Sequence, residues 1–333
     1  KGNRKNMKTA FLQDHTKITG AGLWIYQGYK RAWESLGYKV EYIDGNSEEL
    51  SHMSKLASNN EEYHIMVTDG FWAALNKISN QYKIKDQFDT AMKNAKNVFF
   101  FAQPTKFPPP WGSHPNYISL CDPEHMDEIN ESDNYKLWTF ADVHSGNVKD
   151  AFYPTLKDIA TVPLAFDNFS YKNLEDEKYK FDVCFVGGRA NNGFDEKYKI
   201  MMKHFYAFKD SGLKCGIFVD RGLSHEQENK ILYNSKVSIN IHDAYQRDLG
   251  LDTNERTFKA LGLTGVLVSD DVTQVKRLFP DVKRTNDPEQ MVKIVKEYVN
   301  MPDSELSKIK EENRKKVLEN HTYASRIKQM MEL

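Results

Sequence analysis

Two short stretches of the chain combine side chains that suit an anionic ligand carrying hydroxyl groups. The first is a glycine pair followed by an arginine; glycine lets a backbone approach a phosphate closely, and arginine neutralises it. The second, residues 254–259 (NERTFK), offers the planar donor fork of Arg256 for a phosphate and the carboxylate of Glu255 for hydroxyls. The residues of both stretches are Gly187, Gly188, Arg189, Asn254, Glu255, Arg256, Thr257 and Lys259. Together they predict a site for a nucleotide sugar.

The elements expected around the second stretch place it at the carboxyl edge of a parallel sheet. Residues 236–242 alternate and are β-branched, which is typical of a strand, and His242 and Asp243 close it. A polar loop rich in Asp and Gly follows, and Thr253 or Asn254 then caps a helix. A helix that begins beyond a strand points its free N–H groups to where ligands bind in open α/β sheets. His242 and Asp243 are therefore further candidates for contacts with the base or the donor sugar.

Several of these residues also have a simpler interpretation. Arg189 and Arg256 could form surface or structural ion pairs, and Glu255 could only favour the helix dipole as a first-turn acid. Lys259 could reach a phosphate or lie on an exposed helix face, and Asp243 could cap a helix or a turn. The sequence leaves these alternatives open.

In the first half, the candidates for acid–base catalysis follow predicted strands. Asp14 and His15 come directly after the first predicted strand, and Asp69 ends the third. A carboxylate or an imidazole at such a place could take the proton of an acceptor hydroxyl. The alternative for His15 is a merely solvated loop histidine.

Residues that bind the acceptor are expected in two loops of the same half. Gly20 and Gly22 lie in the loop after the first strand. Trp111 lies in a proline-rich loop, residues 104–116, and offers a stacking surface. The alternative for this second loop is a rigid surface connection.

Strands alternate with helical apolar stripes in both halves, which predicts α/β units with doubly wound parallel sheets. The alternation restarts after a charged, turn-rich segment, so we expect two Rossmann-like domains with a cleft between them. Strands late in the first half are predicted at 137–144 and 161–167. The expected divisions are a first domain (1–167), a linker (168–180), a second domain (181–303) and a helical tail (304–333).

The composition is ordinary for a globular protein. The 333 residues carry a formal net charge of −1, which gives no general attraction to nucleic acid or membranes. Cys121, Cys184 and Cys215 are far apart and lack CxxC spacing, so we expect reduced thiols and a cytoplasmic protein. No apolar run reaches membrane-spanning length, and no cluster of His, Cys and carboxylates has metal-ligand spacing. We therefore expect neither a membrane span nor a bound metal.

The second half resembles a known group of enzymes. The segments NERTFKAL (254–261), VLVSDD (266–271) and NHTYASR (320–326) are similar to the C-terminal half of two-domain glycosyltransferases. The resemblance extends to the spore-maturation-protein-like glycosyltransferases, which are relatives of group 1. At Lys259 the chain departs from the family Glu that contacts ribose, and Glu255 could replace that carboxylate.

This resemblance implies the GT-B fold. The second domain would hold the donor, a UDP-sugar, and the first would bind the acceptor. The tail at 304–333 would pack back onto the first domain. Such enzymes use helix N-termini, backbone N–H groups and basic side chains for the leaving diphosphate, so the resemblance implies neither metal nor cofactor.

A more remote resemblance links the chain to phage DNA-base glucosyltransferases. It rests on FFFAQ (99–103), VGGR (186–189) and the helix that carries Arg256. It implies that DNA could be the acceptor and that the compartment could be the cytoplasm of a virus-infected host cell. Those inverting enzymes end the first segment with an Asp base, where this chain has Gln103, so inversion by that base would be ruled out.

Three functions therefore compete. The leading one is a glycosyltransferase that moves a sugar from a nucleotide sugar to a hydroxyl of a glycan, a small molecule or a protein. The second is a glycosyltransferase that acts on hydroxymethylated DNA bases, which salt-sensitive duplex binding would reveal. The third is a non-catalytic nucleotide-sugar-binding homologue, suggested by Lys259. The sequence leaves the stereochemical outcome open.

Overall fold

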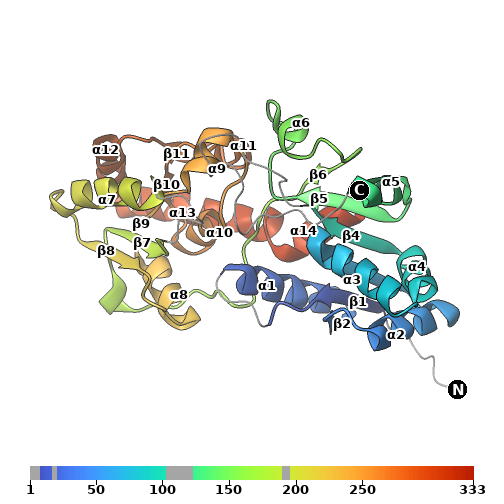
Figure 1. Ribbon diagram of the computed structural model, residues 1–333. Helices are drawn as coiled ribbons and strands as arrows, with labels where there is room; N and C mark the ends of the chain where they lie inside the picture. Colours follow the sequence, from blue (N-terminus) through green and yellow to red (C-terminus); the bar gives the residue numbers. More distant parts are fainter. Residues whose placement is uncertain (1–7, 17–20, 103–122, 190–195) are drawn as a thin grey trace, which may run out of the picture. The chain divides into compact units, whose positions relative to one another are not determined.

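The structure is a computed structural model that describes residues 8–16, 21–102, 123–189 and 196–333. It divides into two compact units, Lys1–Val162 with Arg326–Leu333, and Pro163–Ser325 (Figure 1). The segment expected as a linker, 168–180, lies inside the second unit. Among the helices of the described ranges, none is both long and apolar enough to cross a bilayer.

The first unit is built on a parallel sheet. Its strands are β1 (Lys8–Gln13), β2 (Tyr38–Ile43), β3 (Tyr63–Thr68), β4 (Asn97–Phe101), β5 (Tyr135–Thr139) and β6 (Ala160–Thr161). Their order in the sheet is β2-β1-β3-β4-β5-β6, and every pairing is parallel. The helices are α1 (Ala21–Ser35), α2 (Ser47–Ser58), α3 (Asp69–Gln81), α4 (Lys85–Asn94), α5 (Pro123–Glu131), α6 (Val148–Phe152) and most of α14 (Tyr323–Met331).

Burial explains why these segments form their elements. β4 reads NVFFF, and all of it except Asn97 is buried, as expected for a parallel strand covered on both faces. α1 buries Tyr29, Ala32 and Trp33, which are spaced to lie on one helix face.

The second unit has a parallel sheet of the same kind. Its strands are β7 (Val183–Gly187), β8 (Cys215–Val219), β9 (Val237–Asn240), β10 (Leu267–Ser269) and β11 (Lys283–Arg284). Their order is β11-β10-β9-β7-β8, again with parallel pairings. The helical elements are η1 (Glu177–Tyr179), α7 (Glu196–Lys209), α8 (His225–Asn234), α9 (Ala244–Leu249), α10 (Glu255–Lys259), the π-helical turn η2 (Ala260–Thr264), α11 (Thr273–Leu278), α12 (Pro288–Val299) and α13 (Asp303–Asn320).

Helices and strands of this unit are labelled in Figure 1, and alternate residues of a strand face opposite sides of a sheet. Val183 and Phe185 belong to an apolar core shared with α7 and α12. Cys184 and Ser238 face the other way, and Ser238 Oγ lies 2.6 Å from Thr264 Oγ1 of η2. The helix that carries Arg256 therefore continues into a turn that packs on the second face of the sheet.

The segment expected as a polar loop after β9 contains the short helix α9. Asp243 precedes this helix in an extended conformation. Gly250 ends it with a φ of 64°, which glycine adopts without strain. A cap at each end outweighs the loop-like composition.

The strands expected at 137–144 and 161–167 are both shorter than predicted, as the bounds of β5 and β6 show. The Thr161 hydroxyl donates to the Ala141 carbonyl at 2.7 Å, which turns the chain after β5. Pro163 has no N–H for a sheet ladder, so β6 ends before it.

The helical tail is divided into α13 and α14 around His321. The His321 carbonyl accepts the N–H of Phe166 at 2.8 Å, and Thr322 pairs with Phe166 as an isolated bridge. These backbone groups serve a neighbouring extended segment instead of continuing the helix.

In each sheet the strand order changes direction beside the first strand of the unit. β1 lies between β2 and β3, and β7 lies between β8 and β9. Such places are topological switch points, and ligands of open α/β proteins bind at the carboxyl ends of the strands there. The strand pairs β1/β3 and β7/β9 therefore position the residues described next.

Candidate functional site

Arg256 joins the carboxyl ends of β7 and β9 at the switch point of the second unit. Its Nε donates to the Val186 carbonyl at 2.9 Å, and its Nη1 donates to Asn240 Oδ1 at 2.8 Å. The guanidinium lies over the Phe185 ring, with 4.7 Å between Cζ and the ring centroid. Burial lowers the pKa of Arg256, but a guanidinium stays charged in proteins. The site thus contains a fixed cation whose plane is set by two strands.

Gly187 leaves the space that this guanidinium occupies. A Cβ at Gly187 would overlap with Nη2 and Cζ of Arg256. The two stretches singled out in the sequence therefore meet at one point of the second unit. The described residues give Nη2 no hydrogen-bond partner, since the bonds of Arg256 come from Nε and Nη1.

Arg189 lies beside the same turn, after the half-buried Gly188, and faces solvent. Its Nε is 3.2 Å from Asp220 Oδ2, and the two side chains are 65% and 47% exposed. An ion pair this exposed contributes little to stability. Asp220 has a φ of 52°, which is uncommon outside glycine. The pair borders a cavity of about 360 Å³ lined by Arg189, Tyr198, Met201, Met202, Phe205, Val219 and Asp220.

Lys197 is a second buried cation of this unit, and no motif pointed to it. It lies in the first turn of α7, and its Nζ is 3.2 Å from Asp243 Oδ1, with both side chains under 10% exposed. Burial lowers the pKa of Lys197, and the positive charge of Arg256 lowers it further, against the raising effect of Asp243. A negatively charged ligand would relieve this repulsion.

Lys259 does not lie on an exposed helix face. Its side chain is 11% exposed, and Nζ is 2.7 Å from Glu228 Oε1 and 3.4 Å from Glu255 Oε1. Nζ also donates to the Tyr171 hydroxyl at 3.2 Å. Burial disfavours the ammonium charge, but the two carboxylates outweigh burial and raise the pKa of Lys259 well above its ordinary value. Lys259 is thus tied to α8 and to its own helix.

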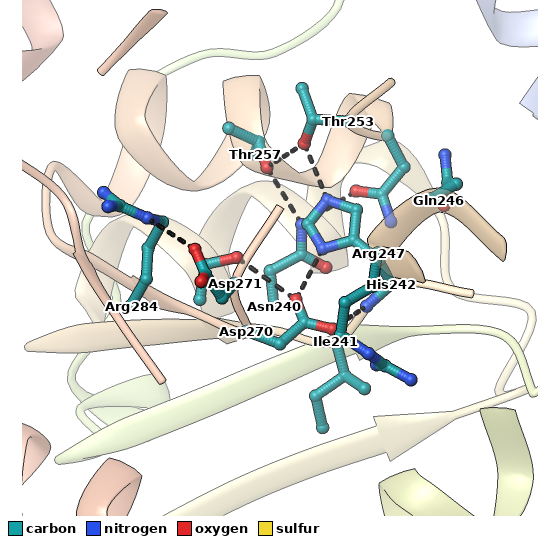
Figure 2. A network of polar contacts seen from close by, with 12 residues as sticks. Asn240, Ile241, His242, Gln246, Arg247, Thr253, Thr257, Asp270, Asp271 and Arg284 are labelled. Carbon is teal, nitrogen blue, oxygen red and sulfur yellow. Dashed lines mark hydrogen bonds and ion pairs between the residues drawn. The ribbon is translucent and has the colours of Figure 1, made fainter. Parts of the chain in front are cut away.

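His242 is buried, although it was expected to face a ligand. Its Nδ1 is 2.6 Å from Asp270 Oδ1, and its Nε2 is 2.7 Å from Thr253 Oγ1 (Figure 2). Burial alone would raise the pKa of Asp270, but the contacts with His242 and Arg247 outweigh burial and lower the pKa to about 2. Asp270 is therefore an ionised acceptor that orients His242.

Asn254 and Thr257 both accept hydrogen bonds from Asn240. The Asn240 Nδ2 donates to Asn254 Oδ1 at 2.8 Å and to Thr257 Oγ1 at 3.0 Å. Asn254 is the N-cap of α10, but its side chain serves the end of β9 instead of the helix N–H groups. Both residues thus fix the Asn240 amide, whose oxygen accepts the hydrogen bond from Arg256.

At the switch point of the first unit, His15 is buried and stacks on Tyr26, with 3.2 Å between the ring centroids. Neither ring nitrogen has a hydrogen-bond partner in the described part of the chain. Burial lowers the pKa of His15 to about 4, although Asp14 opposes this effect. The imidazole is therefore neutral at pH 7 and can accept a proton.

Asp14 and Asp69 follow β1 and β3 as expected. Asp14 Oδ1 accepts hydrogen bonds from the backbone and the hydroxyl of Thr16 at 2.8 and 2.6 Å. Asp69 is the buried first residue of α3, and its Oδ1 accepts the next backbone N–H at 2.7 Å. Burial raises the pKa of Tyr26, and the charge of Asp69 raises it further. Asp69 is therefore close to the ring that stacks on His15.

The remaining sequence candidates are placed as follows. Gly22 is the second residue of α1, so the expected loop ends before it. Across the described ranges, no group of His, Cys, Asp and Glu is arranged to hold a metal ion. Cys184 and Cys215 are free thiols. The candidates outside the described residues are Gly20, Gln103, Trp111 and Cys121.

Sequence reasoning missed Lys197, Asn240 and Tyr26. Lys197 follows the glycine turn at the start of a helix, where a cation can face the same ligand as the turn. Asn240 is a polar residue at the end of an apolar strand, which was a usable signal. Tyr26 has the pattern of an ordinary helix aromatic, and only the fold shows that it meets His15.

The chain is similar to known glycosyltransferases in the sequence of its second half and in its whole fold. The model of the glycosyl transferase-like family matches residues 172–332. An α-glucosyltransferase in complex with UDP-glucose and DNA containing an abasic site is similar in structure, with a TM-score of 0.55, 12% identity and 98% coverage of each chain. No curated protein matches the chain significantly in sequence.

Two further solved structures are similar along their whole length. One, from E. coli, is described as trehalose-6-phosphate bound with UDP-2-fluoro glucose, with a TM-score of 0.54, 9% identity and coverage of 98% and 99%. The other is an α,α-trehalose-phosphate synthase (UDP-forming) from Burkholderia vietnamiensis, with a TM-score of 0.51, 11% identity and coverage of 98% and 100%. These neighbours have the GT-B fold, so the fold class expected from the sequence is confirmed.

Proposed function

Since the chain has the GT-B fold and a glycosyltransferase domain at residues 172–332, we propose that it transfers a sugar from a UDP-sugar to an acceptor hydroxyl. The observation that carries the proposal is Arg256, which is fixed across the ends of β7 and β9 with Nη2 uncommitted beside Gly187. A pyrophosphate at this point would meet a planar donor and a backbone without a side chain. Similar structures hold UDP-glucose or UDP-2-fluoro glucose, which favours uridine as the nucleoside.

The basic side chains are suited to stabilise the leaving group. When the bond between the anomeric carbon and the diphosphate oxygen breaks, negative charge grows on the diphosphate. Arg256 and Lys197 supply two buried positive charges, and Arg189 supplies an exposed one. Fixed charges in a water-poor site stabilise this state without reorganisation. We therefore assign the stabilisation of the leaving diphosphate to these side chains, and we expect the reaction to need no resident cofactor.

Other groups of the second unit suit the rest of the nucleotide. One carboxylate oxygen of Glu255 contacts Lys259, which leaves the other to accept hydrogens from ribose or sugar hydroxyls. The cavity of about 360 Å³ has the planar side chains of Arg189 and Tyr198 on its wall. Its size is in the range of small-molecule sites, and we place the nucleobase of the donor there.

We propose His15 as the base that takes the proton of the acceptor hydroxyl. Its ring is neutral at pH 7, and both ring nitrogens lack partners among the described residues. Asp69 and Asp14 are the carboxylates of the same switch point, suited to orient the acceptor. The acceptor itself is a hydroxyl of a glycan, a small molecule or a protein.

A thermal-unfolding screen with nucleotide sugars and nucleoside diphosphates tests the proposal. A ligand that binds only the folded state at 100 times its Kd stabilises that state by about 2.7 kcal/mol. We expect UDP and at least one UDP-sugar to raise the melting temperature, and other nucleotides to have less effect. If nothing in the panel shifts the melting temperature at millimolar concentration, the proposed donor is wrong.

DNA is the second candidate acceptor, because two similar structures contain DNA beside UDP-glucose or UDP. Titration of duplexes with and without a hydroxymethylated base, at several salt concentrations, separates this function from the first. Transfer of labelled sugar to the modified duplex would establish DNA as the acceptor.

A non-catalytic role remains the third candidate because of Lys259. Release of UDP from a UDP-sugar, lost in Arg256→Ala, would eliminate it. Binding of the sugar nucleotide without any turnover, over a panel of acceptors, would support it.

A further inference from the structure

The polar side chains behind Arg256 form one connected series of hydrogen bonds. Asn240 Nδ2 is 3.0 Å from Thr257 Oγ1, which is 2.7 Å from Thr253 Oγ1. Thr253 Oγ1 is 2.7 Å from His242 Nε2, and His242 Nδ1 is 2.6 Å from Asp270 Oδ1. These five residues, which we call the polar chain, are all fully buried, and Figure 2 shows them in contact between β9, α10 and β10.

Hydrogen-bond donation can run in one direction along the polar chain, and its two ends determine how it starts. Arg256 has only donors, so Asn240 must turn Oδ1 toward it and Nδ2 toward Thr257. At the other end, ionised Asp270 only accepts, so the proton of the His242 ring is on Nδ1.

The two hydroxyls between these ends complete the same direction. In the tautomer that carries its single ring proton on Nδ1, Nε2 accepts from the Thr253 hydroxyl, and the Thr253 oxygen accepts from Thr257. The Thr257 oxygen then accepts from Asn240, so each link has one donor and one acceptor.

Asp270 is the fixed end of this series. Its Oδ2 accepts the backbone N–H of His242 at 2.9 Å and Nη1 of Arg247 at 3.1 Å. The Ser269 hydroxyl also donates to Oδ1 at 3.3 Å, so four bonds hold this carboxylate. A rotation of His242 would break a charge-assisted bond in a buried place.

We propose that the polar chain is a positioning device for Arg256. It fixes the Asn240 amide, which holds Nη1 and leaves Nη2 for the diphosphate of the donor. Thr257, Thr253, His242 and Asp270 act only through Asn240, so they are positioning residues that do not touch the ligand. The proposal rests on the proposed function, because it concerns how Arg256 meets an anionic ligand.

Removing one hydroxyl should break the series. In Thr257→Val one hydrogen of the buried Asn240 amide loses its acceptor, which favours rotation of the amide away from its present orientation. Arg256 then loses the shorter of its two Nη1 bonds and keeps only the 3.4 Å contact with the Ile241 carbonyl, so the guanidinium is held less firmly. Thr257→Ser keeps the hydroxyl and should keep the orientation.

The chain offers a matched control in Thr264. Thr264 is equally buried, and its hydroxyl donates to the Leu232 carbonyl at 2.7 Å and contacts Ser238 at 2.6 Å. It lies beyond α10 and has no bond to Asn240 or Arg256 among the described residues. Thr264→Val therefore loses a buried hydroxyl without touching the polar chain.

The experiment measures the Kd of UDP by calorimetry and stability by urea unfolding for the full chain. We expect Thr257→Val to weaken UDP binding about tenfold, the equivalent of one lost hydrogen bond to a charged group. Thr257→Ser and Thr264→Val should bind UDP within about twofold of the wild type, although Thr264→Val also loses stability. In an Arg256→Ala background, Thr257→Val should change the Kd by less than about twofold, since it has no arginine left to position.

Two outcomes would overturn the positioning role alone: Thr257→Val binds UDP as the wild type does, or its effect is undiminished in the Arg256→Ala background. If the wild type binds no nucleoside diphosphate at all, the proposed function falls and this inference falls with it. If Thr257→Val does not fold, Thr253→Val, with Thr253→Ser as its control, answers the same question.

A measurement without ligand gives an independent answer. The Arg256 Nε–H proton should give a sharp, slowly exchanging NMR signal in the wild type, assigned by its absence in Arg256→Lys. The signal should broaden or shift in Thr257→Val and stay in Thr264→Val. An unchanged signal in Thr257→Val would contradict the proposal.

Discussion

The two switch points have the same topology but opposite polar content. At β7/β9, nearly every buried polar group is bonded to another, from Asp270 through His242 to Asn240 and Arg256. At β1/β3, the buried His15 ring stacks on Tyr26, and the described residues offer its nitrogens no partner. The same sheet order thus gives both units a switch point, and hydrogen bonding makes the two switch points chemically different.

The difference has an energetic meaning. A satisfied network holds a cation in one orientation, which suits a charge that grows on a leaving group. An unpartnered buried imidazole costs free energy in the ligand-free protein and is stabilised when a hydroxyl arrives. The following predictions test this contrast, from the largest expected effect to the smallest.

The largest effect is the pH dependence that His15 gives to folding. Its folded pKa is about 4 and its ordinary value 6.5, so between these values the unfolded chain binds more protons. The contribution of His15 to the free energy of unfolding is fully present above pH 6.5, and it falls by about 3 kcal/mol as the pH drops to 4. Urea unfolding at several pH values should show this loss reduced in His15→Gln.

His64 shifts in the same direction, so the comparison with wild type is the informative quantity. His52→Gln, at an exposed histidine, is the control. If the free energy of unfolding depends on pH identically in the wild type and in His15→Gln, the His15 ring is not buried and neutral.

Arg256→Ala should weaken UDP binding about 100-fold, because it removes a charge-assisted donor from a buried site. The matched control is Arg284→Ala, which removes an arginine of the same unit that pairs with Asp271 at 3.1 Å. Calorimetry should find UDP affinity unchanged in the control. Equal losses in both variants would mean that Arg256 acts only through general charge.

Gly187→Ala should cost about 2 kcal/mol of unfolding free energy and weaken UDP binding, because the new methyl would overlap with the Arg256 guanidinium. Arg256→Ala removes the overlapping guanidinium. Gly187→Ala should therefore cost much less stability in an Arg256→Ala background than in the wild type. Additive losses would place the Arg256 guanidinium away from Gly187.

The smallest expected effect is a stability gain. His15→Phe keeps the ring stack on Tyr26 but removes two unpartnered nitrogens, so it should be as stable as wild type or more stable by about 1 kcal/mol. The same variant should lose sugar transfer, since its ring cannot accept a proton. A stable variant with full transfer activity would rule His15 out as the base.

The sequence singled out Gly187 and Arg256, and the structure places them in contact. Both were candidates because a glycine turn lets a backbone approach a phosphate and a first-turn arginine offers it a cation. The strand order could not be read, because it depends on pairings between distant segments, such as β7 with β9. Without that order, Asn240 has no visible connection to Arg256.

Burial was the other property that the sequence did not supply. Lys259 has a side chain typical of an exposed helix face, and only the packing of α8 against this region encloses it. His242 was expected beside the ligand because it ends a strand, yet Asp270 and Thr253 take both of its nitrogens. In both cases a partner far along the chain decides the role.

The surroundings of Lys259 also constrain how this protein can change. Its ammonium sits between the carboxylates of Glu228 and Glu255, so a glutamate at this position would bring three acids together in a poorly hydrated place. Lys259→Glu should therefore cost less stability in a Glu228→Gln background than in the wild type. The two positions are therefore coupled, and a change at one alters what the other tolerates.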